Sequence, residues 1–143
     1  DTMARLASLE TVVGVKESTG SLQQVQEMIK LCGDKFTVLS GDDWATLPLL
    51  AVGGKGVISV SANIAPRQVA TVISEWEKGN VAAARELHYK LWPLHSTLFI
   101  ETSPTPVKTA LGMMGKISPE VRLPLAGAGA LQKRAKALEP SLR

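Results

Sequence analysis

Three short runs of apolar and β-branched residues are each followed by a stretch in which apolar residues recur every three or four positions. The runs cover residues 11–15, 36–41 and 56–60. Apolar runs of this length are typical of strands buried in a parallel sheet, and the wider spacing is typical of amphipathic helices. The pattern therefore predicts a chain that alternates strand, helix, strand, helix, strand, helix.

The first predicted helix has clear signals at both ends. Ser21 is expected to begin it, and Gly33 is expected to end it in a left-handed conformation. Apolar residues recur at three- and four-residue steps between them: Leu22, Val25, Ile29 and Cys32. These residues predict one apolar helix face.

The second and third helices are delimited by aspartate, proline and glycine. Asp42 or Asp43 can cap the second helix, expected at 44–52 and ended by the breaker Gly53-Gly54. Pro66 is a favoured first helical residue and begins the third. The third helix has one apolar stripe: Val69, Val72, Ile73 and Trp76.

Beyond residue 79 the pattern changes to helices alone. Three are expected: 81–99, 106–114 and about 129–138. Pro93 is expected to bend the first of them because proline removes a helical hydrogen bond. A boundary near Gly79-Asn80 then divides the chain into an α/β layer at 1–79 and a C-terminal helical region at 80–143.

The alternating pattern favours an α/β fold built from part of a barrel. Three βα units alone would leave a parallel sheet with two open edges, whereas a closed eight-stranded barrel has none. We therefore expect the C-terminal part of a TIM (β/α)8 barrel, its last three βα units, followed by the helical region. An open doubly wound sheet is the competing interpretation, but the loop KESTGS after the first strand lacks the G-x-G-x-x-G turn.

Composition excludes several classes of function. The net charge is +3, but Lys and Arg are scattered among Asp and Glu, so a nucleic-acid partner is not expected. The single Cys32 cannot form an intramolecular disulfide, which together with the absence of a leader pattern favours a cytoplasmic protein. The apolar stretches are about ten residues long, too short to cross a membrane.

Lys16 is the strongest candidate for chemistry. It follows a strand of apolar residues, where an amine would be partly desolvated and therefore more often neutral and nucleophilic. In a βα barrel the carboxyl ends of the strands face the active site, so this position agrees with imine formation. The alternative is a strand-end lysine that points into solvent or pairs with Glu17.

Three other groups of residues have ordinary explanations. Gly41 at the end of the second strand permits close approach of a ligand, but Gly41 and Asp42-Asp43 also suit a turn and a helix cap. The glycine-rich 53–56 precedes a strand, whereas a phosphate loop follows one. His88 and His95 share a helix face without a third ligand, so packing or interface roles are expected rather than a metal pair.

Taken together, five segments resemble the dihydrodipicolinate synthase family of pyruvate-dependent aldolases. They occur in the family's order along essentially the whole chain: VGVKESTG at 13–20, LSGDD at 39–43, GGKGVISV at 53–60 with Ala62-Asn63, SPTPVK at 103–108, and RLP at 122–124. The first contains the family's Schiff-base lysine, which corresponds to Lys16.

The resemblance implies a specific chemistry. Lys16 would form a Schiff base with pyruvate, and the resulting enamine would attack L-aspartate-4-semialdehyde to give 4-hydroxy-tetrahydrodipicolinate, on the route to diaminopimelate and lysine. Gly41 and Ile58 would line the pyruvate pocket. Neither a metal nor an organic cofactor is required, because Lys16 does what a carbonyl cofactor would do. Relatives are commonly homotetramers, so a homo-oligomer is expected.

The sequence also departs from the family. The tyrosine and threonine of the proton relay, and the arginine that meets the second substrate, match no position here; Tyr89, the only tyrosine, lies in the helical region. Positioned proton transfer contributes a factor of about 10²–10⁴, so we expect a fragment that is inactive alone. The alternatives are an N-acetylneuraminate lyase or 2-keto-3-deoxy-sugar-acid aldolase, or a non-catalytic half-barrel that binds through its open edges.

Overall fold

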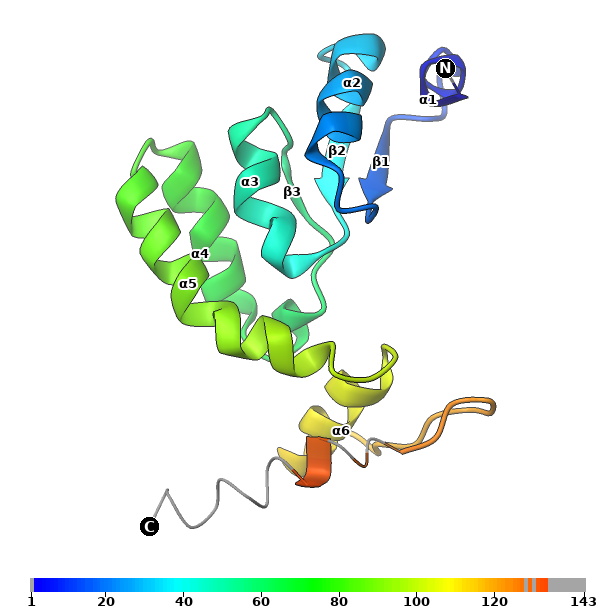
Figure 1. The fold of residues 1–143 in the computed structure, drawn as a ribbon, viewed down its shortest axis with the longest axis vertical. Coiled ribbons are helices and arrows are strands. Elements are labelled where there is room, and N and C mark those ends of the chain that lie inside the picture. Colours follow the sequence, from blue (N-terminus) through cyan, green and yellow to red (C-terminus); the bar gives the residue numbers. More distant parts are fainter. Residues whose placement is uncertain (1, 128, 130, 134–143) are drawn as a thin grey trace.

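The computed structural model describes residues 2–127, 129 and 131–133 of the chain. In chain order, the helices, strands and short 3-10 helices (η) are α1 (Thr2–Ala7), β1 (Gly14–Glu17), α2 (Leu22–Cys32), β2 (Thr37–Ser40), η1 (Asp43–Ala45), α3 (Thr46–Ala51), β3 (Gly56–Val57), η2 (Ser61–Asn63), α4 (Pro66–Glu77), α5 (Val81–Leu98) and α6 (Thr105–Met113). The predicted alternation of strands and helices is confirmed (Figure 1).

The strands form one parallel sheet in the order β1-β2-β3. Lys16 lies opposite Leu39, and Leu39 lies opposite Gly56. The hydrogen bonding continues one step past β3, because the N–H of Ile58 donates to the carbonyl of Ser40 at 2.8 Å. All three predicted strands are present, although each is shorter than its apolar run, and β1 begins three residues later than expected and includes Lys16 and Glu17.

Helices α2 and α3 cover one face of this sheet (Figure 1). The core between them contains five buried side chains: Val25, Met28, Phe36, Val38 and Leu49. Ser21 begins α2 as expected, since its hydroxyl accepts from the N–H of Gln24 at 3.2 Å. The predicted apolar face is partly wrong, because Leu22 is 40% exposed and Met28 takes its place in the core.

Two helix ends differ from the expectation. Gly33 has a φ of 75° as predicted, but its ψ of 179° lies outside the left-handed helical region, and its N–H donates to the carbonyl of Ile29. Neither Asp42 nor Asp43 caps the helix after β2, which begins as the 3-10 turn η1. Helix α1 was not predicted at all, because its six residues are too few for a periodic signal.

Helices α4 and α5 pack side by side beyond α3 (Figure 1). Val69 and Val72 of α4 meet Leu91 of α5 in a second buried cluster. Pro93 lies inside α5, and Figure 1 shows the helix changing direction along its second half. The boundary at Gly79-Asn80, between 1–79 and 80–143, stays a prediction.

Helix α6 confirms the predicted helix at 106–114 to within one residue at each end. The helix expected at about 129–138 lies mostly outside the described residues. Among the described helices, none combines the length and the apolar character needed to cross a bilayer.

The opposite face of the sheet is open among the described residues. Val38 and Ser40 are each 1% exposed beneath the helices, so Leu39 between them points to the other face. Lys16 is paired with Leu39 and therefore lies on that face, and both Lys16 and Ile58 are exposed. The sheet thus has one face for the core and one on which the predicted site residues lie.

Gly54 provides a test of how tightly the helix-covered face is packed. A Cβ at this position would lie 1.6 Å from Cδ2 of Leu49 and 2.9 Å from its backbone oxygen, and Leu49 is itself 1% exposed. Because neither atom can retreat, Gly54→Ala is expected to lower the free energy of unfolding by about 1–3 kcal/mol. Urea unfolding measures this. Gly127→Ala, where an added Cβ meets nothing within 4 Å, is the matched control and should change little.

Candidate functional site

Lys16 occupies the carboxyl end of β1, as the sequence predicts. Its side chain runs across to the next strand, because its Cε lies only 2.8 Å from the point where a Cβ on Gly41 would stand. The expected desolvation is wrong for the described chain: Lys16 is exposed. The reason is that the described helices do not cover the end of the sheet at which Lys16 lies. Lys16 is therefore directed toward the tip of β2 but remains open to solvent.

Gly41 is buried directly beyond β2. Because it has no Cβ, it leaves space for neighbouring side chains that any other residue would fill. An added Cβ would stand 1.7 Å from Oγ of Ser18 and 3.1 Å from the carbonyl oxygen of Glu17. The N–H of Gly41 donates to that same carbonyl at 2.6 Å, which fixes the backbone. The missing side chain is therefore what allows Lys16 and Ser18 to lie over the end of β2.

Ile58 follows β3 and completes the set of predicted site residues. Its backbone is held by the hydrogen bond to Ser40, and its side chain is 49% exposed. Lys16, Gly41 and Ile58 thus lie at the carboxyl ends of three adjacent parallel strands, on the same face. The arrangement places a primary amine beside accessible backbone and an apolar side chain, which suits a small ligand with a carbonyl group.

Asp42 adds an acid to this end of the sheet. Its carboxyl group caps no helix in the described structure. Burial raises the pKa of Asp42 above its ordinary value of 3.8, the charges of Glu17 and Asp43 raise it further, and Lys16 lowers it. The sequence predicts Asp42 only as a possible helix cap. The structure places it close enough to Lys16 for the charge of the lysine to lower its pKa.

Asp43 turns to the other side and is 1% exposed. The hydroxyl of Ser59 donates to its Oδ1, and the N–H groups of Val60 and Ser61 donate to its Oδ2, each at 3.1 Å. Asp43 therefore binds the turn that follows β3 instead of capping its own helix. Hydrogen bonds to charged groups contribute about 1.5–3 kcal/mol each, and these three offset the cost of burying the carboxylate.

The two histidines connect this turn to α5. His95 is 3% exposed, and its Nδ1 lies 2.8 Å from Oγ of Ser61 and 4.0 Å from Oδ1 of Asp43. Burial lowers the pKa of His95 although Asp43 raises it, and the net lowering favours the neutral ring. His88 lies beside it with ring centroids 5.9 Å apart, and its pKa is lowered by burial and by His95. Both side chains are buried, as the packing interpretation expects.

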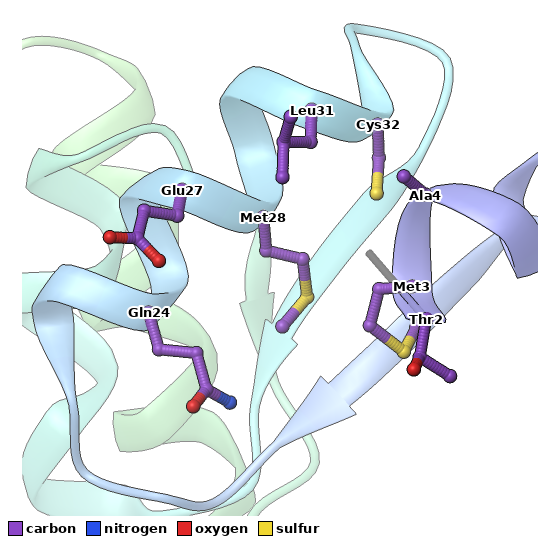
Figure 2. A pocket seen from close by; sticks show the side chains of 8 residues that line it. All are labelled: Thr2, Met3, Ala4, Gln24, Glu27, Met28, Leu31 and Cys32. Atoms are coloured by element: carbon purple, nitrogen blue, oxygen red, sulfur yellow. The ribbon is translucent and has the colours of Figure 1, made fainter.

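Among the described residues, no group of three or more His, Cys, Asp or Glu side chains could hold a metal ion. A cleft of about 240 Å³ lies between α1 and α2 (Figure 2). Met3 of α1 faces Met28 and Cys32 of α2 across it. The lining residues include none of the predicted site residues, so this cleft is separate from the end of the sheet where Lys16 lies.

Comparison with known proteins gives a consistent result. A family model described as "Dihydrodipicolinate synthetase family" matches residues 1–139. The 4-hydroxy-tetrahydrodipicolinate synthase of Thermodesulfovibrio yellowstonii is 62% identical over 124 residues, which are 87% of this chain and 43% of that protein. The chain spans about half the length of the curated relatives it matches.

Solved structures agree with the sequence comparison. The crystal structure of dihydrodipicolinate synthase from Aquifex aeolicus matches with a TM-score of 0.91 and 45% identity, over 99% of this chain and 49% of that one. The chloride-inhibited dihydrodipicolinate synthase from Acinetobacter baumannii, complexed with pyruvate, matches with a TM-score of 0.88 and 38% identity, over 97% and 48% of the two chains.

The buried histidines predict how stability depends on pH. Because the folded-state pKa values of His88 and His95 lie below 6.5, the folded chain binds fewer protons than the unfolded chain just below that pH. The contribution of the two neutral histidines to the free energy of unfolding is complete above pH 6.5 and is lost as the pH falls below it. We expect the free energy of unfolding to decrease by up to about 1 kcal/mol per histidine between pH 7 and about 5.5.

Urea unfolding at a series of pH values measures this slope, and NMR titration of the two imidazole rings measures their pKa values directly. The variant His95→Asn should flatten the slope because it removes one of the two titrating groups. A stability that stays constant or rises as the pH falls from 7 to about 5.5 would contradict the prediction.

Proposed function

The chain belongs to the dihydrodipicolinate synthetase family, and we propose on that premise that it is the Schiff-base-forming part of a 4-hydroxy-tetrahydrodipicolinate synthase. The observation that supports this most is the position of Lys16, whose side chain extends over Gly41 at the carboxyl ends of the parallel strands. We propose accordingly that the three βα units are the C-terminal part of a TIM (β/α)8 barrel, followed by a helical region at 80–143.

The proposed reaction begins with the amine of Lys16. It attacks C2 of pyruvate, water leaves, and the protonated imine then allows C3 to lose a proton and become an enamine carbon. This carbon attacks the aldehyde of L-aspartate-4-semialdehyde. The amine of the second substrate then displaces Lys16 and closes the ring of 4-hydroxy-tetrahydrodipicolinate, so that the free lysine is regenerated without a cofactor.

Gly41 and Ile58 would form the pocket for the keto acid. Gly41 contributes space, because even a methyl group there would meet Lys16 and Ser18. Ile58 contributes an apolar side chain and a backbone held by Ser40. The complex of the Acinetobacter baumannii relative with pyruvate supports this choice of ligand.

Catalysis would require the part of the protein that relatives have outside the matched segment. The sheet face that bears Lys16 is open in the described residues, so water is not excluded from the amine there. Proton transfer also needs positioned groups, which contribute about 10²–10⁴ in rate. A homo-oligomeric assembly and a cytoplasmic location belong to the same proposal.

Trapping with borohydride tests the proposal. We would replace the matched segment of the Thermodesulfovibrio yellowstonii relative with this chain, add labelled pyruvate and sodium borohydride, and locate the label by peptide mass spectrometry. A reduced adduct on Lys16 is expected, and Lys16→Arg, which keeps the charge but cannot form an imine, should give none. Absence of an adduct in the unaltered hybrid would refute the proposal. Turnover with a sugar aldehyde in place of the semialdehyde would refute the choice of second substrate.

Gly41→Ala tests the role of the missing side chain. The added methyl group would overlap Ser18 Oγ and Lys16 Cε, both of which belong to side chains that can rotate away, and would need a shift of only a few tenths of an ångström from the backbone oxygen of Glu17. We therefore expect the amine to be displaced with little loss of stability, and the rate of borohydride trapping in the hybrid to fall by about 10- to 100-fold. Gly127→Ala is the control. A trapping rate equal to that of the unaltered hybrid would show that Gly41 does not shape the pocket.

A further inference from the structure

One buried carboxylate is not used by the proposed chemistry. Asp43 lies two residues after Gly41, is 1% exposed and lines a small cavity together with residues of α4 and α5. Its hydrogen-bond donors are Ser59, Val60 and Ser61, which directly follow Ile58. Asp43 therefore follows β2 closely in the backbone, and its side chain binds the segment that follows β3.

The hydrogen bonds around Asp43 form a closed set. Ser59 donates to the carboxylate and accepts from the N–H of Ala62 at 2.8 Å, so its hydroxyl has both a donor and an acceptor partner. Ser61 presents its N–H to Asp43 and its hydroxyl to His95. The turn after β3 is thereby fixed on one side by Asp43 of η1 and on the other by His95 of α5.

We propose that Asp43 is a positioning residue for the pyruvate pocket: by holding residues 59–61 it sets the distance between the end of β2, which bears Gly41, and the end of β3, which bears Ile58. The inference rests on the proposed function, because it concerns the pocket in which Lys16 reacts. Asp43 acts through the backbone and touches no reacting atom.

The β3 strand explains why such a support is needed. Only Gly56 and Val57 are paired as strand residues, and beyond them one hydrogen bond, from Ile58 to Ser40, continues the ladder. A two-residue strand at the edge of the described sheet has little pairing of its own to fix where it ends. The three bonds to Asp43 begin at the next residue along the chain, so they attach the segment after β3 to η1, the turn that follows β2.

Asp43→Asn in the hybrid protein tests this role. The amide oxygen can accept from two donors, but an NH2 group replaces the oxygen that accepts from Ser59, so the three donors can no longer all be satisfied and the turn should shift. The measurement is made at a temperature where the unaltered hybrid and the variant are both folded. It gives the rate constant for trapping on Lys16 divided by the pyruvate concentration at half-saturation. We expect this ratio to fall by about 10- to 100-fold in the variant. Glu86→Gln, the same change of charge at an exposed position on α5, should leave the rate unaltered.

A second variant covers the case in which Asp43→Asn does not fold. Ser59→Ala removes one of the three donors and keeps both backbone bonds, so we expect a smaller loss, about 3- to 10-fold, by the same geometric argument. In both variants, most of the fall in this ratio should come from a higher pyruvate concentration at half-saturation. A fall in stability with unchanged trapping in both variants would overturn the inference and leave Asp43 a structural residue.

The two proposals fail in different ways. If the unaltered hybrid gives no adduct on Lys16, the proposed function is wrong and the positioning role is wrong with it. If the unaltered hybrid forms the adduct, and Asp43→Asn and Ser59→Ala form it at the same rate and half-saturation, only the positioning role is wrong.

Discussion

Parallel pairing of the three strands is the constraint on which the rest of the structure depends. Because each strand runs in the same direction, all three end at the same edge, and residues distant in sequence meet there. Lys16, Gly41 and Ile58 are brought together in this way, and the register that pairs Lys16 with Leu39 places them on one face. The helices lie on the other face, where Val38 and Leu49 form the core. Packing and proposed chemistry therefore use opposite sides of the same strands.

Much of this could be predicted from the sequence, because the signals are local. Apolar runs predict the strands, Ser21 and Pro66 predict where two helices begin, and Lys16 is assigned by its position after a strand. The family resemblance added Ile58, which no local pattern singles out. The predictions that failed depend on contacts between residues far apart in the sequence. The exposure of Lys16 depends on what covers the sheet, and no pattern within residues 11–20 contains that information.

Asp43 shows the same limit more sharply. An aspartate after a strand and before a helix is a reasonable cap on local grounds. Its actual donors lie 16 to 18 residues further along the chain, and they reach it only because β3 pairs with β2. The contact between Ser61 and His95 joins residues that are even further apart, by 34 positions in the sequence. Polar networks of this kind cannot be predicted from spacing, because a hydrogen bond between distant residues leaves no periodic trace in the sequence.

The segment from Gly41 to Asp43 joins the two sides of the molecule. Gly41 must lack a side chain because Lys16 and Ser18 occupy that space on the open face. Asp43, two residues later, is directed into the helix-covered side, where a carboxylate is tolerated only because three donors meet it. Between them, Asp42 stays half-buried and within reach of the charge on Lys16. Two identical acids thus differ in role because the chain turns from one face of the sheet to the other, and that turn couples the core to the end of the sheet where Lys16 lies.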